Sequence, residues 1–244
     1  MRLYYYTAKL WGMKSLWEKR LKIAEYGDLN DPFELLPFSQ TDREDRKHIK
    51  QVVSVLSKGH GVLCFSASWK STLMWAHYGD KHKGMCLGFE IEDGPHLTKI
   101  EYASKRLPSP IDFSKPLAGI DQDMLTKCLN VKHSGWKYEK EYRLRVSLKD
   151  RRDGLYYFPF CSSMELREII IGARSSLSIV DVAEAVGKEP EADVKIWTAR
   201  AAHSAFNMCT NRELPIETVR GIDPAIKKGR LIAELLQGRS EKSK

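Results

Sequence analysis

The stretch WKYEKEYRLRV, residues 136–146, decides the fold expected for this chain, because charged residues at odd positions alternate with apolar ones at even positions from 141 onward. Alternation with a period of two predicts a strand, and side chains two apart project from the same face of a strand. Glu139, Glu141 and Arg143 are therefore expected to enter the same space. A carboxylate pair beside a cation can orient a sugar hydroxyl or stabilise a positively charged sugar carbon. The alternative is a solvated strand face that carries a ladder of exposed charges.

Size and composition indicate one folded domain. The chain has 244 residues, 42% of them hydrophobic and 30% charged, a balance typical of a folded protein with a sizeable core. We expect a single catalytic-type domain over 1–215 and a basic tail, helical or partly disordered, over 216–244. The sequence has no apolar run of the roughly 18 residues that span a bilayer and no signal-peptide core, which predicts a cytoplasmic protein without a membrane partner.

Several common chemistries are excluded by the motifs that the sequence lacks. It contains no G-x-G-x-x-G, Walker, H-E-x-x-H or G-x-S-x-G motif, which argues against ordinary dinucleotide, triphosphatase, zincin and hydrolase sites. Five widely spaced cysteines without a C-x-x-C pair predict reduced core thiols rather than disulfides or a zinc cluster. The net charge of +8 and the mixture of basic and aromatic residues are compatible with a nucleic-acid partner.

Hydrophobic periodicity predicts strands and helices in an irregular order, and the fold class expected from that order is α+β with a mainly antiparallel sheet. Besides the strand around Glu139, strands are expected at 3–7, 21–24, 61–66, 84–91, 97–103, 154–160, 168–171 and 194–199. Helices are expected at 8–19, 41–56, 71–78, 117–131 and 179–186, the third with Ser71 as N-cap. The Asp93-Gly94-Pro95 turn predicts that 84–91 and 97–103 form a hairpin.

Three further segments carry candidate binding residues. The Asn30-Asp31-Pro32-Phe33-Glu34 segment is a rigid turn that suits a loop beside a ligand, or simply a tight turn. Ser66 and Ser68 follow a buried strand, where they can brace a cofactor ribose or form the turn at the strand end. His77 and Tyr78 are expected to line a pocket for a planar ring.

A metal site is a weaker interpretation of the segment around His77. Imidazole and carboxylate groups at His77, Asp80 and His82 are metal-ligand types, and together with Glu141 they suggest a metal-dependent nuclease. His77 and His82 lie five residues apart, however, which places them on different faces of a helix. We therefore assign no metal ligands.

These segments together resemble a widespread bacterial family that is catalogued only as a domain of unknown function. The shared features are a Leu-Tyr first strand, N-D-P-F-E, C-F-S, M-W-x-H-Y-x-D-x-H-x-G, W-x-Y-E-K-E-Y-R and I-I-x-G. In this sequence they occur at 3–4, 30–34, 64–66, 74–84, 136–143 and 169–172. This resemblance implies no activity.

A second resemblance does imply one. A first strand, a turn-rich loop, a strand that ends in Ser-x-Ser and a later strand that opens with Glu-x-Glu are similar to the plan of mono-ADP-ribosyltransferases. That superfamily binds NAD with a split antiparallel sheet. The resemblance implies that Ser66 and Ser68 support the cofactor ribose, that Glu141 stabilises the charged ribose as nicotinamide leaves, and that Glu139 steers the acceptor.

The superfamily's first-strand Arg or His has no counterpart here. The residues expected to contribute to NAD binding in its place are Tyr4, Tyr6, Asn30, Asp31, His77, Tyr78 and Arg143, with both serines.

The function expected from this resemblance is transfer of ADP-ribose from NAD to a macromolecular acceptor such as nucleic acid. A toxin or phage-defence effector of this kind implies an antitoxin or other regulatory protein as partner. Two other hypotheses stay open. One is a non-catalytic nucleic-acid-binding or ligand-sensing module that stacks bases on Trp75, Tyr78 and Trp136. The other is the metal-dependent nuclease.

Overall fold

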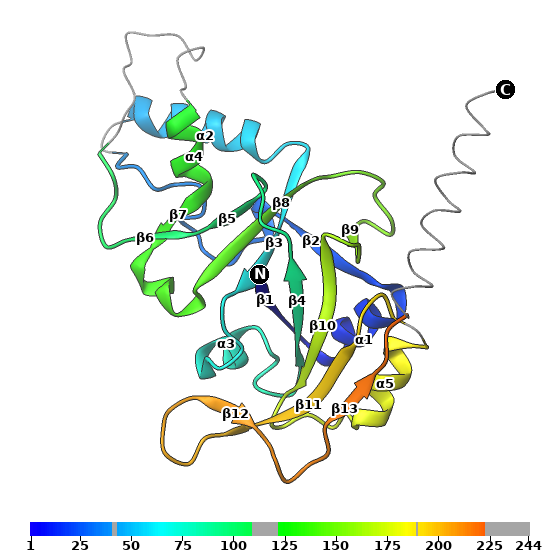
Figure 1. Ribbon diagram of the computed structural model, residues 1–244. Helices are drawn as coiled ribbons and strands as arrows, with labels where there is room; N and C mark the ends of the chain where they lie inside the picture. The colour runs from blue at the N-terminus through cyan, green and yellow to red at the C-terminus, as the bar shows by residue number, and fades with distance from the viewer. Residues whose placement is uncertain (41–42, 109–121, 189, 223–244) are drawn as a thin grey trace, which may run out of the picture.

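The structure is a computed structural model that describes residues 1–40, 43–108, 122–188 and 190–222 (Figure 1). Its helices are α1 (Lys9–Glu18), α2 (Arg43–Leu56), α3 (Thr72–His77), α4 (Gln122–Asn130) and α5 (Ile179–Val186), with 3-10 helices η1 (Tyr26–Asp28) and η3 (Ser134–Glu139). Its strands are β1 (Arg2–Thr7), β2 (Arg20–Glu25), β3 (His60–Ser66), β4 (Met85–Ile91), β5 (Leu97–Lys99), β6 (Glu101–Ala103), β7 (Val131–His133), β8 (Glu141–Ser147), β9 (Tyr156–Pro159), β10 (Met164–Ile171), β11 (Val194–Ala201), β12 (Met208–Thr210) and β13 (Glu217–Val219).

The expected α+β class with a mainly antiparallel sheet is confirmed. The main sheet runs β12-β11-β10-β4-β1-β3-β2-β9, and β10 with β11 is its parallel pair along this path. β6 and β7 form a separate parallel pair. None of the helices in the part of the chain that the structure describes is long and apolar enough to cross a membrane.

The sheet forks at β3. One edge of β3 pairs with β8 over its whole length, from His60 opposite Ser147 to Ser66 opposite Glu141. Its other edge is shared, because β2 pairs near the start of β3 while β1 pairs with Ser66 at its end. Since β1 and β2 cannot both follow the same edge, they diverge and leave a gap for side chains between them.

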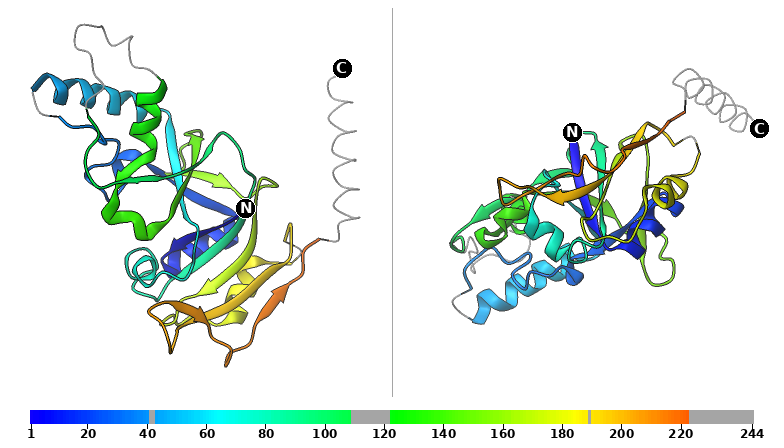
Figure 2. Two further views of the ribbon diagram at one scale, coloured as in Figure 1. Left: turned by 60° about the vertical axis from the view of Figure 1, so that its left-hand side comes forward. Right: turned by 90° about the horizontal axis from the view of Figure 1, so that it is seen from below.

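The two faces of the sheet bury different cores, because successive side chains alternate between them. Leu3, Met85 and Ile169 belong to the larger core, which α1 and α5 cover. Figures 1 and 2 show these two helices side by side, away from α2 and α4. Tyr6 and Ile170 belong to the core of the opposite face, which α3 covers with fully buried Trp75.

A smaller layer beside β8 contains α2, α4, β6 and β7 (Figure 2). It has a core of its own, with Phe38, Ile49, Met124 and Cys128 as the buried members. α4 runs directly into β7, which places Lys132 of β7 behind the fork of the sheet. This layer therefore closes the fork on one side.

Three local predictions are wrong. β4 and β5 do not form a hairpin, because β4 is flanked by β1 and β10 and β5 pairs with β8. The expected strand at 97–103 is two short strands with different partners, β5 and β6. Glu139 ends the 3-10 helix η3 instead of lying on β8.

Other predictions fall partly outside the described residues. The helix expected at 117–131 is observed from Gln122 to Asn130, and its earlier part lies outside them, as does Thr41 at the expected start of α2. Within the expected tail of 216–244, Glu217–Val219 form β13, which pairs with β11. The segment 223–244 lies outside the described residues, and the division of the chain at 215 stays a prediction.

Candidate active site

A cavity of about 190 Å³ lies at the fork of the sheet. Its walls include Tyr4 and Tyr6 from β1 and Cys64 from β3. One end is charged and is formed by Glu34, Lys132, Glu139, Glu141 and Arg143. An aromatic pocket with a charged end is suited to a planar, polar ligand.

The register of the strands aligns one row of residues beside the pocket. Tyr4 of β1 pairs with Ser66 of β3, and Ser66 pairs with Glu141 of β8. Paired residues of neighbouring strands point to the same face. The first strand, the Ser-x-Ser strand and the Glu-x-Glu strand are therefore adjacent, although 137 positions separate Tyr4 from Glu141 in the numbering.

Glu139 and Glu141 share one space, as expected, but a different backbone geometry brings them together. Glu139 is the last residue of η3, and Lys140 follows with a left-handed φ of 46° before β8 begins at Glu141. The turn at Lys140 directs both carboxylates toward Lys132. Both glutamates are buried, with 3% and 4% of their surface exposed, so the alternative of a solvated charge ladder does not apply to them.

Lys132 lies between the two carboxylates. Its Nζ donates to Oε2 of Glu139 at 2.6 Å and to Oε2 of Glu141 at 3.1 Å. The ammonium group also lies 4.9 Å from the ring centroid of Trp136. This buried lysine holds the two carboxylates at a fixed separation.

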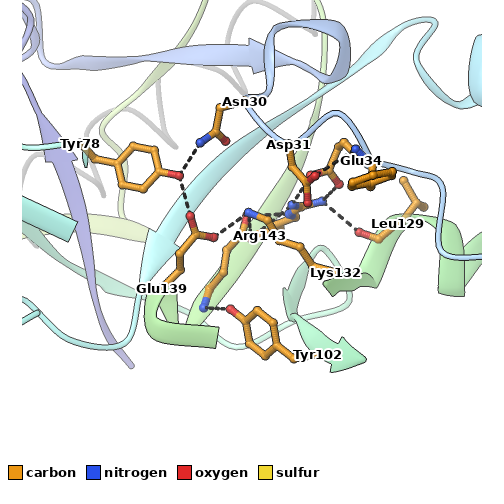
Figure 3. A network of polar contacts seen from close by, with 11 residues as sticks. Asn30, Asp31, Glu34, Tyr78, Tyr102, Leu129, Lys132, Glu139 and Arg143 are labelled. Carbon is orange, nitrogen blue, oxygen red and sulfur yellow. Dashed lines mark hydrogen bonds and ion pairs between the residues drawn. The ribbon is translucent and has the colours of Figure 1, made fainter. Parts of the chain in front are cut away.

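Arg143 joins the pair to the N-D-P-F-E turn. Its guanidinium donates to both oxygens of Glu141, with the shortest contact 2.6 Å from Nε to Oε1, and to both oxygens of Glu34 at 2.5 and 2.9 Å. It also donates to the carbonyl oxygen of Leu129 (Figure 3). Asp31 supports the turn by accepting the backbone N–H of Phe33 at 2.9 Å. The turn therefore positions Glu34 against β8.

Tyr78 forms the outer side of the carboxylate site (Figure 3). Its hydroxyl donates to Oε1 of Glu139 at 2.5 Å and accepts from Nδ2 of Asn30 at 2.8 Å. Tyr78 directly follows α3, whose N-cap is Ser71, as predicted, with its Oγ accepting the N–H of Met74. Asn30, Tyr78 and Glu139 thus form a chain of hydrogen bonds at the rim of the pocket.

The two carboxylates differ in proton affinity. Burial raises the pKa of Glu139 above its usual value despite the attraction of Lys132. Burial acts the same way on Glu141, but the charges of Arg143 and Lys132 outweigh it and lower the pKa of that carboxyl. Glu141 therefore holds its negative charge more firmly, and Glu139 is the member of the pair that binds a proton more readily.

The cluster carries a surplus negative charge. Three carboxylates, on Glu34, Glu139 and Glu141, face two cations, on Lys132 and Arg143. Burial lowers the pKa of both cations, but the neighbouring carboxylates raise it above the usual range overall, so both stay charged. Burial is the largest cause of the raised pKa of Glu139, and a positively charged ligand beside the carboxylates would lower that pKa.

The structure brings together most of the predicted site residues. Seven of them line the cavity, namely Tyr4, Tyr6, Asn30, Tyr78, Glu139, Glu141 and Arg143. The other four do not. Asp31 is buried in its turn, and His77 is exposed beside Tyr138. The hydroxyl of Ser66 donates to the carbonyl oxygen of Ser68 and accepts the backbone N–H of Ser68. The roles assigned to all these residues stay predictions.

Lys132 and Glu34 were not predicted as partners of the Glu-x-Glu pair. Glu34 was noted only as the end of the N-D-P-F-E turn, and Lys132 lies in a short V-K-H strand with no distinctive motif. The residues next to Lys132, Val131 on one side and His133 and Ser134 on the other, give no signal that this lysine is buried. Tyr102 was missed as well, and its hydroxyl accepts the backbone N–H of Glu141 at 2.9 Å.

A metal centre finds no support in the residues that the structure describes. Among them, no group of three or more His, Cys, Asp and Glu side chains lies close enough to hold an ion. Asp80 is exposed and the ring of His82 stacks on Trp75, with 6.3 Å between centroids. Burial also raises the pKa of the Cys64 and Cys86 thiols, as expected for inert core cysteines.

Comparisons with known proteins give one partial match. No curated protein and no solved structure matches the chain. Residues 74–144, which contain Tyr78, Lys132, Glu139, Glu141 and Arg143, match the model of a family described as "Protein of unknown function (DUF2971)".

Proposed function

We propose that the pocket holds the nicotinamide ribose of NAD and that the protein transfers ADP-ribose from NAD to a macromolecular acceptor. The observation that carries this proposal is the buried Glu139–Glu141 pair, aligned with Ser66 and Tyr4 at the fork of an antiparallel sheet. The sheet fork and the order β1-β3-β8 are what the resemblance to mono-ADP-ribosyltransferases implies for the strands that hold NAD.

Charge supports a nicotinamide ring as the ligand. The nicotinamide of NAD carries one positive charge. The ion-pair network of three carboxylates with Lys132 and Arg143 carries one surplus negative charge, and Lys22 is a further cation on the cavity wall. The rings of Tyr4, Tyr6 and Tyr78 line the same cavity and offer aromatic surface to a cationic ring.

The size of the cavity limits which part of NAD it holds. Pockets for whole drug-sized ligands begin near roughly 300 Å³, whereas this cavity measures about 190 Å³. It therefore suits one end of the dinucleotide, the nicotinamide and its ribose. The adenylate would lie outside the cavity.

The side chains of the pocket account for each charge and proton in the proposed reaction. The bond between ribose C1′ and the nicotinamide nitrogen breaks, and its electron pair leaves with nicotinamide, which becomes neutral. Glu141 stabilises the positive charge that develops on the ribose, and it stays ionised because Arg143 and Lys132 hold it so. The acceptor's nucleophile then bonds to C1′ and gives its proton to Glu139, whose raised pKa suits a general base.

The acceptor that best fits the basic chain is a nucleic acid. An enzyme that consumes NAD in this way would act in the cytoplasm as a toxin or phage-defence effector. It would then need a regulatory partner, such as an antitoxin, to restrain it.

The test follows label from NAD. The protein is incubated with NAD labelled in its adenylate phosphate and with cell extract, and label in nucleic acid and protein fractions is counted together with free nicotinamide. We expect wild type to release nicotinamide, and Glu139→Gln and Glu141→Gln to lose at least 100-fold in rate. Glu18→Gln changes a carboxylate that does not line the pocket, so it is the matched control and should act as wild type. Wild type without nicotinamide release or label transfer would refute the proposal.

One observation favours a second candidate, a ligand-sensing module without chemistry. Each oxygen of Glu139 and Glu141 already accepts a hydrogen bond from within the chain. Such a closed network suits a site that binds a cation and changes shape. Calorimetric binding of NAD or nicotinamide riboside with no product after prolonged incubation would select this function over the transferase.

A further inference from the structure

We infer that a second concave surface, which we call the basic groove, binds the backbone of single-stranded nucleic acid. The groove has a volume of about 1040 Å³ and lies where β3, β8 and β9 meet the loop between β8 and β9. This inference stands on its own observations, whether or not the pocket cleaves NAD.

Cations dominate the lining of the basic groove. Five Lys and Arg side chains line it, from Arg20, Lys58, Arg145, Lys149 and Arg152, together with two histidines. Asp150 is the only carboxylate among its lining residues. A concave surface with so strong an excess of one charge concentrates the field and attracts polyanions.

Most of these cations have no acidic partner among the residues that the structure describes. Arg20 pairs with Glu18 at 2.8 Å, but within the described ranges no ion pair is formed by Lys58, Arg145, Lys149 or Arg152. Lys58, Lys149 and Arg152 are exposed, on loops that flank the groove. Their charges are therefore available to phosphates.

The groove also offers surfaces on which bases can stack. The guanidinium of Arg20 lies 3.8 Å from the ring centroid of Tyr157, and Phe158 lines the same hollow. Unpaired bases stack on aromatic rings and on guanidinium planes. A duplex, by contrast, is read by convex elements that enter its grooves, so the hollow favours a single strand.

The volume and the number of cations argue against a small anion. The hollow is at the upper end of the roughly 300–1,000 Å³ typical of small-molecule sites, and five cations exceed what one or two phosphates require. A chain of phosphates uses all of them.

The basic groove adjoins the carboxylate pocket. Arg145 follows Arg143 on the same face of β8, and Leu129, whose carbonyl accepts from Arg143, lines the groove. A strand held in the groove would therefore pass beside the pocket.

Fluorescence anisotropy tests the inference with the full chain and a labelled 20-nucleotide single strand, as RNA and as DNA, over a series of salt concentrations. The groove variant is Lys58→Glu, Lys149→Glu, Arg152→Glu. The matched control is Lys70→Glu, Lys83→Glu, Arg212→Glu, which reverses three exposed cations outside the groove. Both triple variants change the net charge from +8 to +2, so only position distinguishes them.

We expect wild type and the control to bind with similar affinity and salt dependence. The groove variant should bind at least tenfold more weakly, and the slope of log K against log salt should fall by about 2, because each lost phosphate contact contributes roughly 0.7 for single strands. Equal loss in both variants, no binding of either strand by wild type, or displacement of the strand by equimolar pyrophosphate would overturn the inference. Thermal unfolding checks that both variants fold, and it should show no difference because all six sites are exposed.

Discussion

Replacing Lys132 by Met should destabilise the protein strongly at pH 8 and less at pH 5. Lys132 is 6% exposed at its side chain and contacts Glu139 and Glu141 at 2.6 and 3.1 Å. Methionine keeps much of the side-chain volume but removes the charge, so two buried carboxylates lose their shared partner.

The magnitude follows from opposing contributions. Each contact contributes roughly 4 kcal/mol of attraction at an effective dielectric constant of about 20. The variant recovers the cost of burying the ammonium group, which is several kcal/mol. The lost attraction minus the recovered burial cost lowers the free energy of unfolding by about 3–5 kcal/mol, a loss typical of a buried ion pair that has lost one partner.

The pH dependence has a definite sign. Without Lys132, the pKa of both carboxyls rises in the folded state, so folding takes up protons as the pH falls. The variant therefore recovers stability relative to wild type between pH 8 and pH 5. Urea unfolding followed by tryptophan fluorescence at both values measures this change.

Lys14→Met is the matched control, because Lys14 and Glu18 form a partly exposed i,i+4 pair at 3.9 Å. It should cost less than about 1 kcal/mol at either pH. If Lys132→Met costs no more than this control, or its cost does not change with pH, the description of a buried, charge-coupled site is wrong.

Three further changes test the site and the fold. In wild type, activity should be lost as the pH falls through the raised pKa of Glu139, because the base becomes protonated. Glu139→Gln should therefore abolish the fall in kcat/KM at acid pH, which is measured as nicotinamide release from pH 4.5 to 9. Tyr78→Phe removes a hydrogen bond that lowers the pKa of Glu139, so the same acid limb should move to higher pH, and an unchanged limb would exclude Glu139 as the base. Gly84→Ala should lower the free energy of unfolding by at least about 1–3 kcal/mol, because the new Cβ would overlap the backbone oxygen of Thr7. Gly94→Ala is its control, since a Cβ there meets open space, and it should be neutral in the same thermal unfolding measurement.

Local periodicity was sufficient to predict most single elements. Alternation identified β8, the apolar run at 61–66 identified β3, and the Ser71 cap marked the start of α3. Each of these signals is contained within a few residues, so no knowledge of distant contacts is needed.

Strand partners could not be predicted in the same way. The turn at 93–95 has hairpin chemistry, but both edges of β4 are taken by β1 and β10, so β5 pairs with β8 instead. The competition for an edge is decided by the whole sheet. Likewise, the left-handed residue Lys140, which ends the 3-10 helix before β8, leaves no trace in the alternation.

In the candidate site, too, neighbouring residues could be predicted from the sequence and distant partners could not. Its acidic centre was predicted because Glu139 and Glu141 lie two residues apart. Its other parts come from distant segments, since Glu34 is 109 residues from Arg143, and Lys132 enters from β7. The network of three carboxylates and two cations therefore forms only when the chain is folded.

A crystal structure of the protein with an NAD analogue whose ribose ring oxygen is replaced by carbon, so that it cannot be cleaved, shows directly whether the pocket holds the nicotinamide ribose. We expect the nicotinamide ring between Tyr4 and Tyr78, with a ribose hydroxyl within about 3 Å of a carboxylate oxygen of Glu139 or Glu141. An analogue bound elsewhere, with the Lys132 network unchanged and the cavity holding only water, would contradict it.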